Sequence, residues 1–195
     1  MRLIALGDSM VAGAGDPAHL GWIGRALKGR RDVTLYNLGV RRETSADIAA
    51  RWEAEVRPRW VDYEPMRIVL SCGINDCHPD GDGEARVRVA MAQTLANIED
   101  MLAKASTYGQ VLLVGPPPVV SPGVMARLEV LNGHLGTRAS QWGAPFIDVL
   151  HPLAASGVWQ AEASTWDGAH PGAAGYQQMA DLVLAHPAWQ AFVRA

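Results

Sequence analysis

The chain has 195 residues, of which 49% are apolar and 19% are charged, and this composition excludes an intrinsically disordered protein. Seventeen basic and twenty acidic side chains give a net charge of −3, which provides no electrostatic basis for binding nucleic acid or an anionic membrane. The length suits one α/β domain, so residues 1–195 are expected to form a single domain.

The sequence shows no targeting or membrane-spanning segment. The apolar run Leu3–Leu6 ends at Gly7 and is too short for the apolar region of a signal peptide. No uncharged apolar stretch approaches the ~20 residues that a membrane span needs. Two cysteines, Cys72 and Cys77, are too few for a disulfide scaffold. We therefore expect a cytoplasmic protein, with export left open because a processed N-terminus would remove the signal.

Short apolar runs alternate along the chain with segments of helical periodicity. The predicted strands are Arg2–Leu6, Val33–Asn37, Arg67–Ser71, Val111–Val114 and Pro145–Asp148. Apolar residues three and four apart predict helices over residues 48–56, 87–102, 128–135 and 176–184. This alternation predicts an α/β fold with a central parallel sheet of about five strands.

Ligands of such sheets bind beyond the carboxyl ends of the strands. The chemistry is therefore expected in the segments that follow the strands, which are residues 7–15, 38–44, 72–83, 115–123 and 149–172.

Ser9 follows the first predicted strand, within Gly7-Asp8-Ser9-Met10. One interpretation is a nucleophile exposed at the edge of the sheet. The other is a helix N-cap, which is the commoner role of a serine after a strand.

A carboxylate three residues before a histidine can bond its Nδ1–H and leave Nε2 free as a base. Asp167 and His170 have this spacing and are followed by Pro171, shortly before the last predicted helix. The spacing alone is weak, because two other pairs share it. They are Asp16 with His19, and Asp148 with His151.

Asn75 follows the third predicted strand, where its side-chain N–H can stabilise an oxyanion. Gly39 follows the second strand, where the backbone can approach a ligand closely. The alternative for both positions is a plain turn, since Gly, Asn and Asp favour turns.

Together, Ser9, Gly39, Asn75 and the Asp167/His170 pair follow successive elements of one predicted sheet. This order resembles the SGNH, or GDSL-type, serine hydrolases, which are named for a Ser, Gly, Asn and His in four sequence blocks. The match extends from Gly7 to Pro171. The resemblance implies a three-layer α/β/α fold with a flavodoxin-like parallel sheet, and an esterase that needs no cofactor.

The resemblance also implies roles for individual residues. Ser9 is the nucleophile, His170 is the general base and then the general acid, and Asp167 orients the imidazole. The oxyanion hole is expected from the N–H groups of Ser9 and Gly39 and from the side chain of Asn75.

Asp8 and Asp76 resemble supporting residues of the family rather than catalysts. The family's last block precedes the final helix, which favours Asp167/His170 over Asp148/His151. The sequence departs from the family at Arg42, where relatives often have a second glycine three residues after the first. Arg42 is either a contact for a polar or acidic substrate or, as is commoner for arginine, a solvated loop residue.

The expected substrate is a small-molecule ester, with short acyl chains favoured. A carbohydrate O-deacetylase and an acyl-thioesterase of the same family are alternatives. Other classes remain as well: a metal-dependent hydrolase using the Cys72–Asp82 loop, a non-catalytic module, and a dinucleotide site in the glycine-rich segment 13–18. Asp16 disfavours the last of these because it would repel phosphate. The sequence gives no indication of the oligomeric state.

Overall fold

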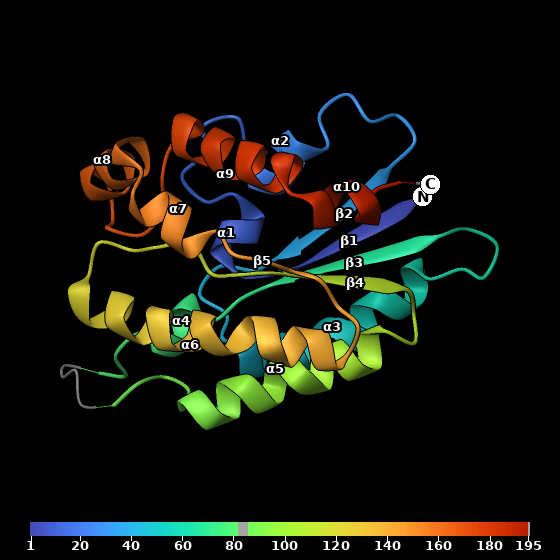
Figure 1. The fold of residues 1–195 in the computed structure, drawn as a ribbon, viewed down its shortest axis with the longest axis horizontal. Helices are drawn as coiled ribbons and strands as arrows, with labels where there is room; N and C mark the ends of the chain where they lie inside the picture. The colour runs from blue at the N-terminus through green and yellow to red at the C-terminus, as the bar shows by residue number, and fades with distance from the viewer. Residues whose placement is uncertain (82–85, 195) are drawn as a thin grey trace.

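Five parallel strands form the central sheet, in the order β2-β1-β3-β4-β5. They are β1 (Arg2–Gly7), β2 (Thr34–Gly39), β3 (Met66–Ser71), β4 (Gln110–Val114) and β5 (Phe146–Ile147). The structure, a computed structural model, describes residues 1–81 and 86–194 (Figure 1). The predicted parallel α/β sheet is confirmed.

Each predicted strand overlaps an observed one, with differences at the ends. Strand β2 runs on to Gly39 because its pairing with β1 continues through Leu38 opposite Leu6 and Gly39 opposite Gly7. Strand β5 contains only two residues, which pair with Leu113 and Val114 of β4.

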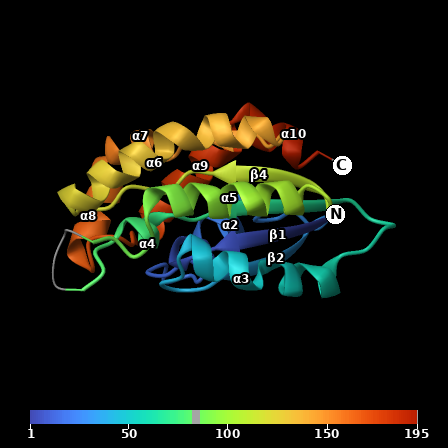
Figure 2. The same ribbon diagram turned by 90° about the horizontal axis from the view of Figure 1, so that it is seen from below.

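Helices cover both faces of the sheet and complete the three-layer arrangement (Figures 1 and 2). One layer holds α3 (Ser45–Val56), α5 (Met91–Ala105) and α6 (Pro122–Gln141). The other holds α2 (Gly21–Ala26), α9 (Ala173–Ala185) and α10 (Pro187–Phe192). Within the layers, α5 packs against both α3 and α6, and α9 packs against both α2 and α10.

Short helices occupy segments that were expected to be loops. The segment 149–172 contains α7 (Leu150–Ala154) and α8 (Gly157–Thr165). The segments after β1 and β3 contain α1 (Ser9–Ala12) and α4 (Ile74–Cys77). A 3₁₀ turn (Arg57–Arg59) also follows α3. These helices span too few turns to produce a clear helical period. Conversely, Val87 was expected in a helix but pairs with Pro79 in an isolated bridge, and α5 begins only at Met91.

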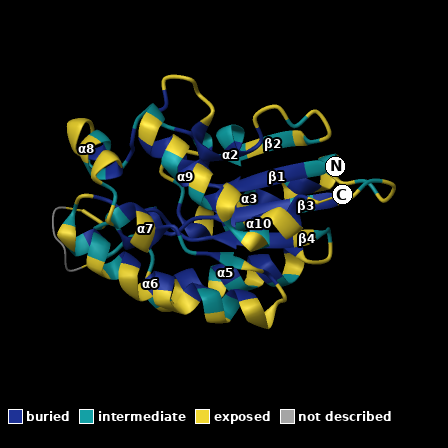
Figure 3. Ribbon diagram, turned by 45° about the horizontal axis from the view of Figure 1, so that its top comes forward, coloured by how far each residue is buried: buried dark blue, intermediate teal, exposed yellow. Residues whose placement is uncertain are grey.

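The core lies between the sheet and the two helical layers, with β1 and β3 at its centre (Figure 3). Leu3, Ile4 and Ala5 have no exposed surface, which is typical of a parallel strand covered on both faces. In the described part of the chain, no helix has both the length and the apolarity needed to cross a membrane.

The strand order places a topological switch point at β1. The chain continues from β1 to β2 on one side, while β3 pairs with β1 on the other side. In doubly wound sheets a crevice forms beyond the carboxyl ends of the strands at this point. Ser9 follows β1 and Asn75 follows β3, so both lie at that crevice.

Candidate active site

Ser9 lies directly after β1, where the chain turns into α1. Only glycine fits at Gly7, since a Cβ atom there would lie 2.2 Å from the backbone oxygen of Ser71 in β3 and 2.4 Å from Cγ2 of Val11 in α1. The N-cap of α1 is Asp8, whose Oδ1 accepts the N–H of Met10 at 2.9 Å. The interpretation of Ser9 as the N-cap is therefore wrong. Asp8 takes that role and leaves the Ser9 hydroxyl available to another partner.

That partner is His170, from the loop before α9. Its Nε2 lies 2.7 Å from Oγ of Ser9, and its Nδ1 lies 2.7 Å from Oδ2 of Asp167. Oδ1 of Asp167 also accepts the backbone N–H of His170 at 2.9 Å, so one carboxylate fixes both the loop and the ring. With Nδ1–H donating to Asp167, Nε2 is left to accept the proton of the serine hydroxyl.

The environment of Asp167 favours its ionised form. Burial acts to raise the pKa of this carboxyl, but hydrogen bonds from the backbone and ring of His170 and from the N–H of Ala169 outweigh it. The pKa of Asp167 therefore lies below its ordinary value. An ionised carboxylate at this position holds the tautomer and stabilises the imidazolium formed when His170 takes a proton.

The pair Asp148 and His151 has similar local geometry but a different setting. Nδ1 of His151 is hydrogen-bonded to Oδ2 of Asp148, and Asn132 donates to Oδ1 of the same carboxylate at 3.0 Å. The His151 side chain is 63% exposed. Its ring is bonded to no serine hydroxyl in the described part of the chain, so this pair lacks a nucleophile.

Asp16, the first residue of the third pair, has a structural role. Its carboxylate accepts the N–H of Gly21 at 2.9 Å and the guanidinium of Arg25 at 2.7 Å. These bonds fold the glycine-rich segment onto the start of α2, and they place a carboxylate where a dinucleotide site would need room for phosphate.

Asn75 lies in α4 and lines the same cavity as Ser9 and His170. Its Nδ2 donates to the backbone oxygen of Glu43 at 2.9 Å, which leaves the second hydrogen of the amide for another acceptor. This bond also holds the loop after β2 against α4.

Asp76, the residue after Asn75, connects α4 to neighbouring helices. It is fully buried, and its carboxylate accepts the N–H and the hydroxyl of Ser45 and the hydroxyl of Thr94. Ser45 begins α3 and Thr94 lies in α5, so the hydrogen bonds of this carboxylate connect α4, which also carries Asn75, to α3 and α5. This geometry fits the supporting role expected for Asp76.

Asp8 is the second buried carboxyl near the nucleophile, with 1% exposure. Burial raises the pKa of Asp8 to about 7, and the nearby charge of Asp76 adds to the rise. Oδ2 of Asp8 is buried without a hydrogen-bond partner among the described residues, which fits a side chain that carries a proton at mildly acidic pH.

Gly39, expected to supply an N–H to the oxyanion hole, lies against the turn that carries Ser9, but its N–H has another acceptor. Its N–H donates to Oδ1 of Asn37 at 3.0 Å, and Gly39 does not line the cavity at Ser9. A Cβ atom at this position would lie 2.3 Å from the backbone nitrogen of Ala12 and 2.8 Å from the backbone oxygen of Asp8. Gly39 is thus needed for the close approach of β2 to α1.

Arg42, three residues further on, does line the cavity at Ser9. Its φ of 70° lies in the left-handed region, where glycine is most comfortable, which agrees with the glycine that relatives often have there. The backbone N–H groups of Arg42 and Ser9 donate to no acceptor in the described part of the chain. The sequence left two interpretations of Arg42 open, a contact for a polar or acidic substrate and a solvated loop residue, and did not identify its backbone N–H as a candidate donor.

The cavity at Ser9 has a volume of about 350 Å³, and eight of its twelve lining residues are polar or charged. Arg41 and Arg88 were not anticipated from the sequence, and His78 was considered only as part of the possible metal loop Cys72–Asp82. Trp166 borders the same region, since its ring centroid lies 5.4 Å from that of His170. None of these residues belongs to a short motif, so only the folded chain reveals them.

The residues of the proposed metal loop do not converge. Cys72 and Cys77 are buried, and burial raises the pKa of both thiols. Asp76 is bonded to hydroxyl groups as described above, and Asp80 is paired with Arg86. No group of three metal-ligating side chains occurs among residues 1–81 and 86–194, and Asp82 lies outside the described residues.

Residues 5–178 match the model of the GDSL-like lipase/acylhydrolase family. The chain belongs to that family. It is accordingly a hydrolase of the esterase and acylhydrolase type, as the sequence resemblance implied. No curated protein matches the sequence.

Solved structures of GDSL-type proteins share the fold. A member of the lipolytic G-D-S-L family from Veillonella parvula is 22% identical with a TM-score of 0.75, and the match covers 100% of both chains. An acetylxylan esterase from Geobacillus stearothermophilus is 20% identical with a TM-score of 0.76, over 94% of this chain and 92% of that chain. A lipase/acylhydrolase from Enterococcus faecalis is 22% identical with a TM-score of 0.75, over 94% and 93%.

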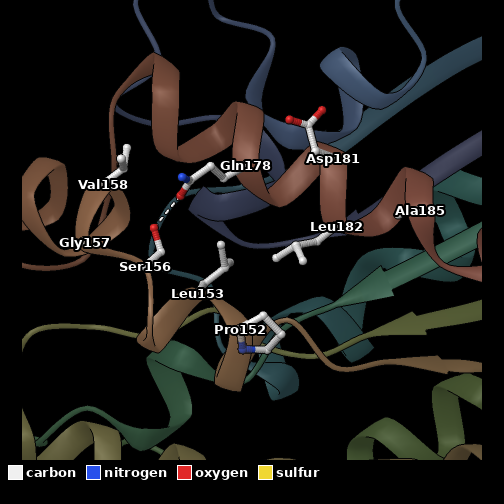
Figure 4. Close-up of a pocket in the computed structure, with 9 residues that line it drawn as sticks. All are labelled: Pro152, Leu153, Ser156, Gly157, Val158, Gln178, Asp181, Leu182 and Ala185. Carbon is white, nitrogen blue, oxygen red and sulfur yellow. Dashed lines mark hydrogen bonds between the residues drawn. The ribbon is translucent and has the colours of Figure 1, made fainter.

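A larger cavity, of about 700 Å³, lies away from the GDSL-type site, between α7, α8 and α9 (Figure 4). Leu153 and Leu182 line it, and the hydroxyl of Ser156 donates to the side chain of Gln178 across it. Neither Ser9 nor His170 lines this cavity, so its size does not identify it as the site of the chemistry.

Proposed function

We propose that the protein is a serine esterase, contained in one domain, that hydrolyses small carboxylic esters through an acyl-enzyme. The observation that carries the proposal is the continuous hydrogen-bonded chain from Ser9 through His170 to Asp167, with 2.7 Å at each step. A nucleophile, a base and an orienting carboxylate in this geometry are what acyl transfer requires.

In the first half of the reaction, Oγ of Ser9 attacks the ester carbonyl while its proton passes to Nε2 of His170. The tetrahedral intermediate then collapses, the bond to the alcohol oxygen breaks, and His170 donates the proton to that oxygen. Asp167 remains ionised throughout and stabilises the imidazolium.

We assign the oxyanion hole to the N–H groups of Ser9 and Arg42 and to Nδ2 of Asn75. Support comes from the cavity that these three residues share and from the two backbone N–H groups that have no acceptor in the described part of the chain. Arg42 replaces Gly39 in this assignment, since the N–H of Gly39 is bonded to Asn37. Donors held in place before the reaction stabilise the charge that develops on the carbonyl oxygen.

In the second half, His170 takes a proton from a water molecule, which attacks the acyl carbon. The oxyanion forms again, and its collapse breaks the bond to Oγ of Ser9, which recovers its proton from His170. The products are the carboxylic acid and the free enzyme.

The cavity favours esters with a short acyl group. Its volume is about 350 Å³, and only four of its twelve lining residues are apolar, namely Met10, Ile74, Pro79 and Ala169. A long acyl chain would need a continuous apolar surface, because its burial is the main source of its binding energy.

A carbohydrate O-acetyl esterase is the second candidate. The observation that favours it is the indole of Trp166, which is 54% exposed and borders His170. An exposed ring offers a flat apolar face against which a sugar ring can pack. The structural neighbour from Geobacillus stearothermophilus is an acetylxylan esterase.

The test compares wild type and Ser9→Ala on 4-nitrophenyl acetate, butyrate and decanoate and on acetylated xylo-oligosaccharides. We expect turnover of the shorter esters that falls with acyl length, at least about 10³-fold loss in Ser9→Ala, and no effect of EDTA. Activity that survives Ser9→Ala, or that is lost with EDTA and restored by zinc, would contradict the serine mechanism. A preference for the acetylated sugars would select the second candidate.

A further inference from the structure

Three arginine side chains, those of Arg41, Arg42 and Arg88, line the cavity that contains Ser9 and His170. We propose that they form a binding site for an anionic group, a carboxylate or a chemically similar oxyanion, carried by the ester substrate. This inference rests on the proposed esterase function and narrows its substrate to negatively charged esters.

The charge balance of the cavity is the first argument. Among the described residues, Asp167 is the one acidic residue that lines it, and Asp167 is bonded to His170. Nearby Glu43 is paired with Arg51. No ion pair involves the guanidinium groups of Arg41, Arg42 or Arg88 within the described part of the chain. Because the whole protein carries a net charge of −3, a cationic cavity does not follow from its composition.

The backbone of Arg42 is the second argument. Its φ of 70° strains a residue with a Cβ atom, and glycine would adopt this conformation without strain. The strain does not improve packing, since the side chain is exposed and lines the cavity beside the nucleophile. The strained backbone at Arg42 is therefore consistent with a task for the guanidinium at this cavity.

The position of Arg41 is the third argument. Its guanidinium lies 5.7 Å from the ring centroid of Trp166, which in turn packs beside His170. This cation–π contact holds a mobile side chain at the edge of the cavity and leaves its N–H groups for an oxyanion. Guanidinium groups bind carboxylates through two parallel hydrogen bonds, so a prepositioned arginine suits such a ligand.

Arg88 and His78 also line the cavity. The N–H of Arg88 donates to the backbone oxygen of His78 at 3.0 Å, which holds the two residues together. Burial and the charges of Arg88 and Arg127 lower the pKa of His78, so it is a neutral hydrogen-bonding group at neutral pH. Hydrogen bonds from Thr44 and, to a smaller degree, the charge of Arg88 lower the pKa of Asp47, so the charge of Arg88 also acts on that carboxylate.

The experiment uses matched pairs of esters that differ in one charge. On the acyl side, mono-4-nitrophenyl glutarate is compared with 4-nitrophenyl methyl glutarate. On the alcohol side, 4-acetoxybenzoate is compared with methyl 4-acetoxybenzoate. The rate of uncatalysed hydrolysis is subtracted in each case. The pair with the larger preference shows which side of the scissile bond faces the arginines.

We expect kcat/KM of wild type to be at least about tenfold higher for the anionic member of one pair. The preference should shrink between about 20 mM and 500 mM salt, because exposed charges are screened. Arg42→Gly, which suits the left-handed backbone, and Arg41→Gln should each lower the ratio of anionic to neutral kcat/KM severalfold. Arg31→Gln is the matched control because it removes the same charge at the other end of the strands. Arg31 precedes the amino end of β2, whereas the cavity lies beyond the carboxyl ends.

The outcomes separate this inference from the proposed function. Turnover of the neutral esters that depends on Ser9, without any preference for the anionic members, would overturn the anion site and leave the esterase standing. A preference that persists in both arginine variants would also overturn it. If wild type hydrolyses none of the four esters, both proposals are contradicted.

Discussion

Nε2 of His170 lies 2.7 Å from Oγ of Ser9, although 161 positions separate the two residues in the sequence. The contact depends on the sheet, which brings the loop after β1 and the loop before α9 to one edge. Nothing local to either residue creates it, and this explains why three Asp-x-x-His pairs cannot be ranked by spacing alone.

The two similar histidines should differ sharply on substitution. His170→Ala is expected to lower kcat by at least about 10³, nearly as much as Ser9→Ala, with little further loss in the double variant, because the two residues act as a unit. His151→Ala should cost less than about tenfold, since its exposed ring touches no nucleophile. Steady-state kinetics of the four proteins make the comparison. If His151→Ala is inactive and His170→Ala is active, the general base is His151 and not His170.

Asn75→Ala tests the oxyanion donor. Loss of one such donor costs about 10²–10³ in kcat, and KM should change little because the bond strengthens in the transition state. The substitution also removes the bond to Glu43, so the melting temperature is measured alongside the kinetics. A folded variant with unchanged kcat would exclude Asn75 from the oxyanion hole.

Gly39→Ala tests the packing role that the structure gives this glycine. The new methyl group would meet the backbone of Ala12 and Asp8, neither of which can move freely, so we expect the free energy of unfolding to fall by at least about 2 kcal/mol. Gly133→Ala, in α6 with no atom within 4 Å of the new Cβ, is the control and should be neutral or stabilising by about 0.5–1 kcal/mol. Denaturant titrations measure both. Equal stability of the two variants would contradict the close approach of β2 to α1.

The buried carboxyl of Asp8 should make stability depend on pH. Its pKa rises from 3.8 to about 7 on folding, so between these values the folded state keeps a proton that the unfolded chain has released. The contribution of Asp8 to the free energy of unfolding is therefore present in full below pH 3.8 and is lost as the pH rises toward 7. Asp8→Asn, which mimics the neutral acid, should flatten this part of the profile and melt higher than wild type at pH 8. The same slope in both proteins, measured by melting temperature against pH, would contradict the shift.

Much of the fold could be predicted because its signals are local. Five apolar runs between helical segments specify the sheet, and parallel strands place the residues that follow them at one edge. The predicted ends of strands and helices that differ from the structure are those that depend on tertiary contacts. Strand β2 continues to Gly39 only because β1 offers partners there, and α7 and α8 are too short to show a period.

The site was predictable in part for the same reason. Ser9, Asn75 and His170 each follow or precede an element that topology brings to the crevice. Gly39 and Arg42 could not be distinguished from the sequence. Our assignment of Arg42 rather than Gly39 to the oxyanion hole rests on the bond from Gly39 to Asn37 and on the left-handed φ at Arg42, a conformation that arginine rarely adopts. Arg41, Arg88 and Trp166 carry no motif and come together only in the folded chain.

The most direct test of the serine mechanism is the site of covalent capture. Wild type is treated with a fluorophosphonate, the adduct is counted by intact mass, and its position is mapped by peptide sequencing. The account predicts one adduct per chain, on Ser9, formed much more slowly in His170→Ala and at the wild-type rate in His151→Ala. An adduct on another residue, or no adduct on an enzyme that still hydrolyses esters, would contradict it.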